Sequence, residues 1–67
     1  MVLEVGKEYI NRVGKIVKIK TYMGEGLIYP FLGYDGESYT KEGKYYRDNI
    51  SPFDLIKPYQ KKVTLYL

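Results

Sequence analysis

The chain has 67 residues, eleven basic and eight acidic, with a formal net charge of +3 and no cysteine or histidine. At this length we expect one domain over residues 1–67, burying only about 60% of the surface that its unfolded chain exposes. The composition excludes disulfide bonds, a Cys/His zinc site, and nucleophilic catalysis by a thiolate or a Ser-His pair.

Nine tyrosines, seven glycines and the absence of alanine favour short strands joined by tight turns. Residues 6–14 predict a short strand between two glycines, and residues 15–22 predict the longest strand. In the longer strand Val17 and Ile19 alternate with polar residues, which places them on one face. The opposite face is predicted to carry Lys18, Lys20 and Tyr22.

The middle of the chain predicts hairpins. The apolar run 27–32 contains a proline, so it is expected to be an edge strand or a bent one. Asp35 and Gly36 predict a type I′ hairpin turn, with both residues at positive φ. A second hairpin loop is predicted at residues 40–43. Two very short strands are predicted on either side of it, at residues 37–40 and 44–47.

The C-terminal part predicts a helical turn followed by a strand. Ser51 can cap a helix and Pro52 suits its first position, while a later proline limits the helix to a turn near residues 51–56. Residues 61–67 alternate between polar and apolar and predict a strand. This strand either pairs with residues 9–13 to close a barrel or pairs with a second copy of the chain as a homodimer.

Five to six short strands with one short helical turn near residues 51–56 predict an all-β fold, a small antiparallel barrel of SH3-like type. A three- or four-stranded sheet with irregular ends is the alternative.

Turn glycines and strand aromatics follow one pattern through most of the chain: Gly6-Lys7-x-Tyr9, Arg12-x-Gly14-Lys15-x-Val17-x-Ile19, Tyr29-Pro30-Phe31-x-Gly33-x-Asp35-Gly36, Tyr39, Gly43-Lys44-Tyr45 and Asp54-Leu55-Ile56. Over these segments the chain resembles a loose group of small, mostly uncharacterised proteins of tailed bacteriophages and prophages. The resemblance implies a phage accessory or host-takeover protein. That group has no shared active site, so no functional residue is carried over.

No catalytic group stands out in the sequence. Without histidine, only carboxylates, lysines and tyrosines remain for acid–base chemistry. Asp35 is explained by its hairpin and Asp54 by the start of the predicted helix. We therefore predict a protein that is not an enzyme and has no cofactor and no metal site.

Tyrosines near the predicted hairpins are the candidate protein-binding residues, because exposed aromatic rings are enriched at interfaces. The leading hypothesis is a non-enzymatic module of phage type that docks on a host or phage protein. Inhibition of a host enzyme or defence component is one form of such docking. The candidate residues are Tyr34, Tyr39, Tyr45 and Tyr46.

A nucleic-acid-binding barrel is the alternative from a different class, because lysines and stacking aromatics together suit single strands. Its candidate residues are Arg12, Lys18, Lys20, Tyr22, Lys62 and Tyr66. A structural or assembly subunit is a third hypothesis. The first residues do not form a signal peptide and no segment reaches transmembrane length, so the expected location is the cytoplasm of the host cell, with no membrane partner.

Overall fold

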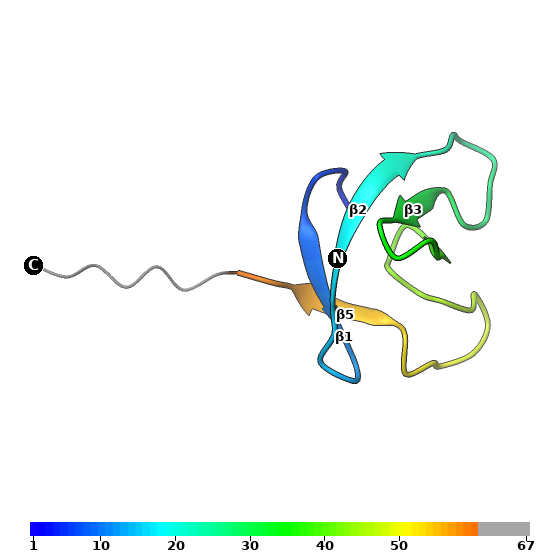
Figure 1. Cartoon of the computed structure of the whole chain (residues 1–67). Coiled ribbons are helices and arrows are strands. Elements are labelled where there is room, and N and C mark those ends of the chain that lie inside the picture. Colours follow the sequence, from blue (N-terminus) through cyan, green and yellow to red (C-terminus); the bar gives the residue numbers. More distant parts are fainter. Residues whose placement is uncertain (61–67) are drawn as a thin grey trace, which may run out of the picture.

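The computed structural model describes residues 1–60, and these form short strands and no helix (Figure 1). The strands are β1 (Glu8–Asn11), β2 (Ile16–Tyr22), β3 (Phe31–Gly33), β4 (Ser38–Tyr39) and β5 (Leu55–Pro58). Neighbouring strands are antiparallel, in the order β4-β3-β2-β1-β5 across the sheet. The sheet curls into a half-barrel, which confirms the predicted all-β antiparallel fold.

Strand β2 pairs with β1 along its first half and with β3 along its second half. Val17 and Ile19 are buried, whereas Lys18 and Lys20 are exposed. This alternation agrees with the prediction, because successive side chains of a strand point to opposite faces. The first part of β2 therefore has one face in the core and one in solvent.

A bulge changes the pattern in the second half of β2. The pairing with β3 shifts between Ile19 and Thr21, so Lys20 is an extra residue in the ladder. An extra residue moves the side chains that follow to the other face. Tyr22 consequently pairs with Phe31, and their ring centroids are 5.0 Å apart. The prediction that Tyr22 shares a face with the lysines of β2 is therefore wrong.

The hydrophobic core takes side chains from every strand and from the N-terminal segment: Leu3, Tyr9, Val17, Ile19, Phe31, Tyr39 and Leu55. Both core tyrosines satisfy their hydroxyl groups. The Tyr9 hydroxyl accepts a hydrogen bond from the amide of Glu4 at 2.8 Å, and the Tyr39 hydroxyl donates to Asp35 at 2.5 Å. A buried hydroxyl that has a partner avoids the cost of desolvation, so these rings serve as large core residues.

Three tight turns, at residues 11–14, 33–36 and 40–43, share one backbone design. In each, the amide of the final glycine donates to the carbonyl of the first residue at 2.9–3.0 Å, and that glycine has a φ of 83–91°. No other residue type has a positive φ within residues 1–60. The predicted type I′ turn is therefore wrong for Asp35, whose carboxylate accepts the amide of Glu37 at 3.1 Å. The turn is type I followed by a left-handed glycine.

The segment before β5 contains a single turn, closed by the amide of Asp54 donating to the carbonyl of Ser51 at 3.1 Å. A helix would continue with the amide of Leu55 donating to the same carbonyl. Instead Leu55 donates to the carbonyl of Gly43 at 2.8 Å, which joins the start of β5 to the loop after β4. The predicted helical turn near residues 51–56 is therefore wrong.

Strand β5 occupies the edge of β1, where the closing strand was predicted. Tyr9 pairs with Pro58, and Asn11 pairs with Leu55. The predicted strand over residues 61–67, together with the homodimer contact assigned to it, lies outside the described residues. Within residues 1–60, no helix has the length and apolar character needed to cross a membrane.

Candidate protein-binding surface

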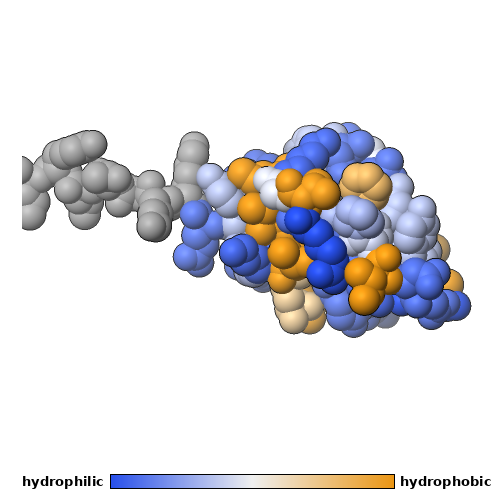
Figure 2. Space-filling view, turned by 90° about the horizontal axis from the view of Figure 1, so that it is seen from below, coloured by the Kyte–Doolittle hydropathy of each residue, from blue (hydrophilic) through white to orange (hydrophobic). Residues whose placement is uncertain are grey.

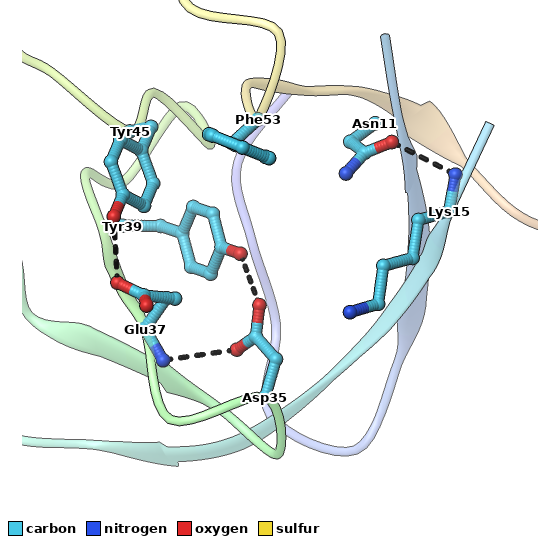
Figure 3. Close-up of a pocket in the computed structure, with 7 residues that line it drawn as sticks. All are labelled: Asn11, Lys15, Asp35, Glu37, Tyr39, Tyr45 and Phe53. Carbon is cyan, nitrogen blue, oxygen red and sulfur yellow. Dashed lines mark hydrogen bonds between the residues drawn. The ribbon is translucent and has the colours of Figure 1, made fainter. Parts of the chain in front are cut away.

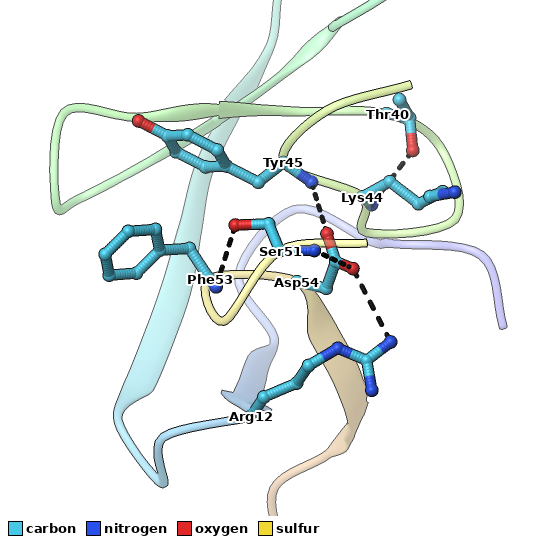
Figure 4. Close-up of polar contacts among 7 residues, drawn as sticks. All are labelled: Arg12, Thr40, Lys44, Tyr45, Ser51, Phe53 and Asp54. Carbon is cyan, nitrogen blue, oxygen red and sulfur yellow. Dashed lines mark hydrogen bonds and ion pairs between the residues drawn. The ribbon is translucent and has the colours of Figure 1, made fainter. Parts of the chain in front are cut away.

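Residues 45–54 form a loop whose ends are held together by one buried carboxylate. Asp54 is 3% exposed and accepts hydrogen bonds from the amides of Tyr45 at 2.9 Å and Ser51 at 3.0 Å (Figure 4). The guanidinium of Arg12 lies 3.5 Å from the same carboxylate. A compact loop with its ends tied in this way holds its side chains on a fixed backbone.

Hydrogen bonding keeps the Asp54 carboxylate ionised in spite of its burial. Burial by itself raises the pKa of this group, whereas the amides of Ser51 and Tyr45 and the guanidinium of Arg12 lower it. The lowering effects prevail, so the pKa of Asp54 is below its ordinary value of 3.8. Arg12 is thus engaged with the loop rather than with the lysines of the predicted nucleic-acid surface.

The loop presents a cluster of aromatic rings centred on Tyr45. The Tyr45 ring centroid is 4.8 Å from that of Tyr46, 5.3 Å from that of Phe53 and 6.1 Å from that of Tyr39. Tyr46 is 52% exposed and Phe53 is 50% exposed. The hydroxyl of Tyr29 accepts the amide of Arg47 at 2.9 Å and ties the loop to the segment before β3.

The structure therefore brings together three of the four predicted protein-binding tyrosines. Tyr39 belongs to the core, so the expectation that its ring is accessible is wrong, whereas Tyr45 and Tyr46 reach the surface. The sequence did not identify Phe53 as a candidate binding residue, because the residues around it predict the start of a helix. We call the rings of Tyr29, Tyr45, Tyr46 and Phe53 the aromatic surface.

An open pocket of about 170 Å³ adjoins the aromatic surface (Figure 3). We call it the Glu37 pocket, and its lining residues are Asn11, Lys15, Asp35, Glu37, Tyr39, Tyr45 and Phe53. A second, more open hollow is lined in part by Tyr29 and Tyr46. Glu37 and Tyr45 line both hollows, so the two adjoin one another at this pair of residues.

Two tyrosine hydroxyls donate to carboxylates in the Glu37 pocket. Tyr39 donates to Asp35, and Tyr45 donates to Glu37 at 2.8 Å. Burial, followed by the hydrogen bond to Asp35, raises the pKa of Tyr39. The hydrogen bond to Glu37, followed by burial, raises the pKa of Tyr45. Both hydroxyls therefore stay protonated, and each donates a hydrogen bond to its carboxylate.

Tyr34 lies with the lysines of β2 and not with the aromatic surface. Its ring is 65% exposed, and the ammonium groups of Lys18 and Lys20 are 5.9 and 5.8 Å from its centroid. These distances are at the outer limit of a cation–π contact. We call Lys18, Lys20 and Tyr34 the lysine face. Of the other predicted nucleic-acid residues, Lys62 and Tyr66 lie outside the described residues.

No group of three or more His, Cys, Asp or Glu side chains within residues 1–60 is arranged to hold a metal ion. No protein-family model matches the chain, and no curated protein or solved structure matches it either. The functional conclusion therefore depends on the geometry of these surfaces.

Proposed function

We propose that the chain is a non-enzymatic protein-binding module that docks through its aromatic surface. The observation that carries the proposal is a set of half-exposed rings on a loop that the buried Asp54 carboxylate holds in place. Tyrosine and phenylalanine supply much contact area for few rotatable bonds, and a fixed loop loses little entropy on binding. On the face of the molecule in Figure 2, apolar residues are interspersed with hydrophilic ones, and a non-obligate interface is about as apolar as the rest of a protein surface.

The resemblance to phage and prophage proteins supports a host or phage protein as the partner, met in the cytoplasm of the host cell. In this proposal the module acts by covering a surface of its partner, and inhibition of a host enzyme or defence component is one result. A rigid aromatic patch suits this role because a few central rings supply most of the affinity of an interface.

Capture from a bacterial lysate with immobilised protein, followed by mass spectrometry, tests the docking proposal. Tyr46→Ala and Phe53→Ala each remove one half-exposed ring of the aromatic surface, and we expect each to weaken binding of the captured partner by about tenfold. Tyr34→Ala is the matched control, because it removes an exposed ring outside the surface. Equal losses in all three variants would contradict the proposal.

A second candidate function, binding of single-stranded nucleic acid, is favoured by the lysine face. A ring that is 65% exposed beside two ammonium groups offers one base a stacking partner and its phosphates two cations. Glu8 lies opposite Lys18 in the β1–β2 ladder and adds a negative charge to this side of the sheet, which weakens the case.

Oligonucleotide binding measured at two salt concentrations separates the two functions. Release of counterions makes phosphate binding fall steeply with salt, and each lost contact flattens the slope by about one unit. Under the docking proposal we expect no micromolar binding. Salt-sensitive binding that the Lys18→Ala/Lys20→Ala pair abolishes would replace docking by this second function.

A further inference from the structure

The Glu37 pocket has room for one side chain of a partner. Its volume of about 170 Å³ is below the roughly 300–1,000 Å³ of pockets that enclose drug-sized ligands. Tyr39, Tyr45 and Phe53 line it together with the carboxylates of Asp35 and Glu37, which lie beside the two tyrosine hydroxyls (Figure 3). The pocket therefore combines aromatic rings with fixed negative charge.

Both carboxylates already accept hydrogen bonds from neighbouring groups. Asp35 accepts the hydroxyl of Tyr39 on one oxygen and the amide of Glu37 on the other. Glu37 accepts the hydroxyl of Tyr45 on Oε2, while its Oε1 has no hydrogen-bond partner within residues 1–60. One carboxylate oxygen of the pocket lining thus remains available.

The opposite wall holds a buried donor that points into the same space. Asn11 is 3% exposed, and its Oδ1 accepts the amides of Val13 at 3.1 Å and Lys15 at 2.8 Å. Its side-chain nitrogen donates to no described residue and turns towards the pocket (Figure 3). Because no fully buried side-chain nitrogen or oxygen in residues 1–60 lacks a partner, this nitrogen must reach the open space of the pocket.

The charge of the pocket is negative in sum. Two carboxylates and the Lys15 ammonium leave one net negative charge, and the ammonium faces the pocket without forming an ion pair to either carboxylate. Lysine side chains are flexible, so an incoming cation can displace this ammonium into solvent. The charge of Lys15 therefore weakens the binding of a cationic ligand and strengthens that of an anionic one. Replacement of Lys15 consequently tests whether the ligand is positively or negatively charged.

We propose that the Glu37 pocket binds the side chain of an arginine residue of the partner protein, an assignment that rests on the docking function. The guanidinium donates to the free Oε1 of Glu37 and lies near the negative charge of Asp35, while its plane packs against the rings of Tyr45 and Phe53. Arginine suits this geometry better than lysine, because its planar group forms several directed hydrogen bonds and also stacks on aromatic rings. The main-chain carbonyl of the same residue accepts the free donor of Asn11.

Titration of the ¹⁵N-labelled full chain with N-acetyl-arginine methylamide, followed by NMR, tests the proposal directly. We expect saturable shifts of the Glu37 and Tyr45 amides in the millimolar range and no such response to the citrulline analogue, which has the same shape without the charge. Glu37→Gln should weaken binding by about fivefold, and Lys15→Met should strengthen it by about twofold or more. Glu42→Gln, a carboxylate of the neighbouring turn that does not line the pocket, should change nothing.

Four results would overturn the arginine assignment. They are an equal response to the citrulline analogue, binding that Glu37→Gln leaves unchanged, a tighter response to the anion guanosine monophosphate than to the arginine probe, and no response to the arginine probe. If the arginine probe fails while Tyr46→Ala and Phe53→Ala still lose the captured partner, docking stands and only the chemistry assigned to the pocket is wrong.

Discussion

Replacement of Asp54 is the sharpest test of how the binding loop is held. Asp54→Ala removes the acceptor of two main-chain amides, those of Tyr45 at 2.9 Å and Ser51 at 3.0 Å. A hydrogen bond to a charged acceptor contributes about 1.5–3 kcal/mol, so for the two bonds we expect a loss of roughly 3–6 kcal/mol in the free energy of unfolding. That is comparable with the whole stability of a chain this small, roughly 0.05–0.15 kcal/mol per residue.

Asp54→Asn is the measurable form of this test, because asparagine keeps the shape of the side chain and one acceptor oxygen. We expect it to lower the free energy of unfolding by about 1–2 kcal/mol. Arg12→Ala should lower the free energy of unfolding by less than about 1 kcal/mol, since its contact is long at 3.5 Å and the arginine side chain is 45% exposed. The Arg12 variant therefore separates the ion pair from the main-chain hydrogen bonds.

Urea denaturation followed by tyrosine fluorescence and circular dichroism measures these differences. Asp48→Asn is the matched control, because within residues 1–60 its exposed carboxylate pairs only with the neighbouring Arg47, and we expect a change within about 0.5 kcal/mol. Wild-type stability in Asp54→Asn, or an equal loss in Arg12→Ala, would refute the reasoning that the amides of the loop carry the effect.

Three further predictions concern the same turns and the same carboxylate. Gly43→Ala should lower the free energy of unfolding, measured by urea denaturation, by about 2 kcal/mol or more. Residue 43 has a φ of 91°, and an added Cβ would lie 2.9 Å from the carbonyl oxygen of Leu55. Gly36→Val should lower the free energy of unfolding by more than about 1 kcal/mol, because Gly36 has a φ of 83°, although no atom would crowd the new Cβ. An unchanged urea midpoint would show that residue 36 is not in the left-handed conformation. Acid should also destabilise the fold through Asp54. The pKa of Asp54 is lower in the folded than in the unfolded chain, so its contribution to the free energy of unfolding is present above about pH 4 and is lost as the pH falls through the folded pKa. The Asp54→Asn variant lacks this group, so its free energy of unfolding should fall less steeply below pH 4 than that of the wild type.

Local patterns in the sequence were sufficient for the strand class and for the turn positions. Alternation alone placed Val17 and Ile19 inside and Lys18 and Lys20 outside, because a strand turns each successive side chain to the opposite face. The glycine at the end of residues 40–43 correctly predicted a tight turn with a left-handed residue at Gly43, because glycine tolerates positive φ without strain. These features depend on a few adjacent residues and not on what the chain meets later.

Non-local contacts decided the rest of the site. Residues 51–54 carry the signals of a helix start, yet Leu55 gives its amide to the distant carbonyl of Gly43, and β5 follows instead. Tyr39 and Tyr46 are the same amino acid near neighbouring turns, but one fills the core and the other remains half exposed. A tyrosine carries both an apolar ring and a polar hydroxyl, so its own chemistry suits either place. Which place it takes depends on the partners that tertiary folding brings to it, and these lie too far along the chain for a local pattern to record.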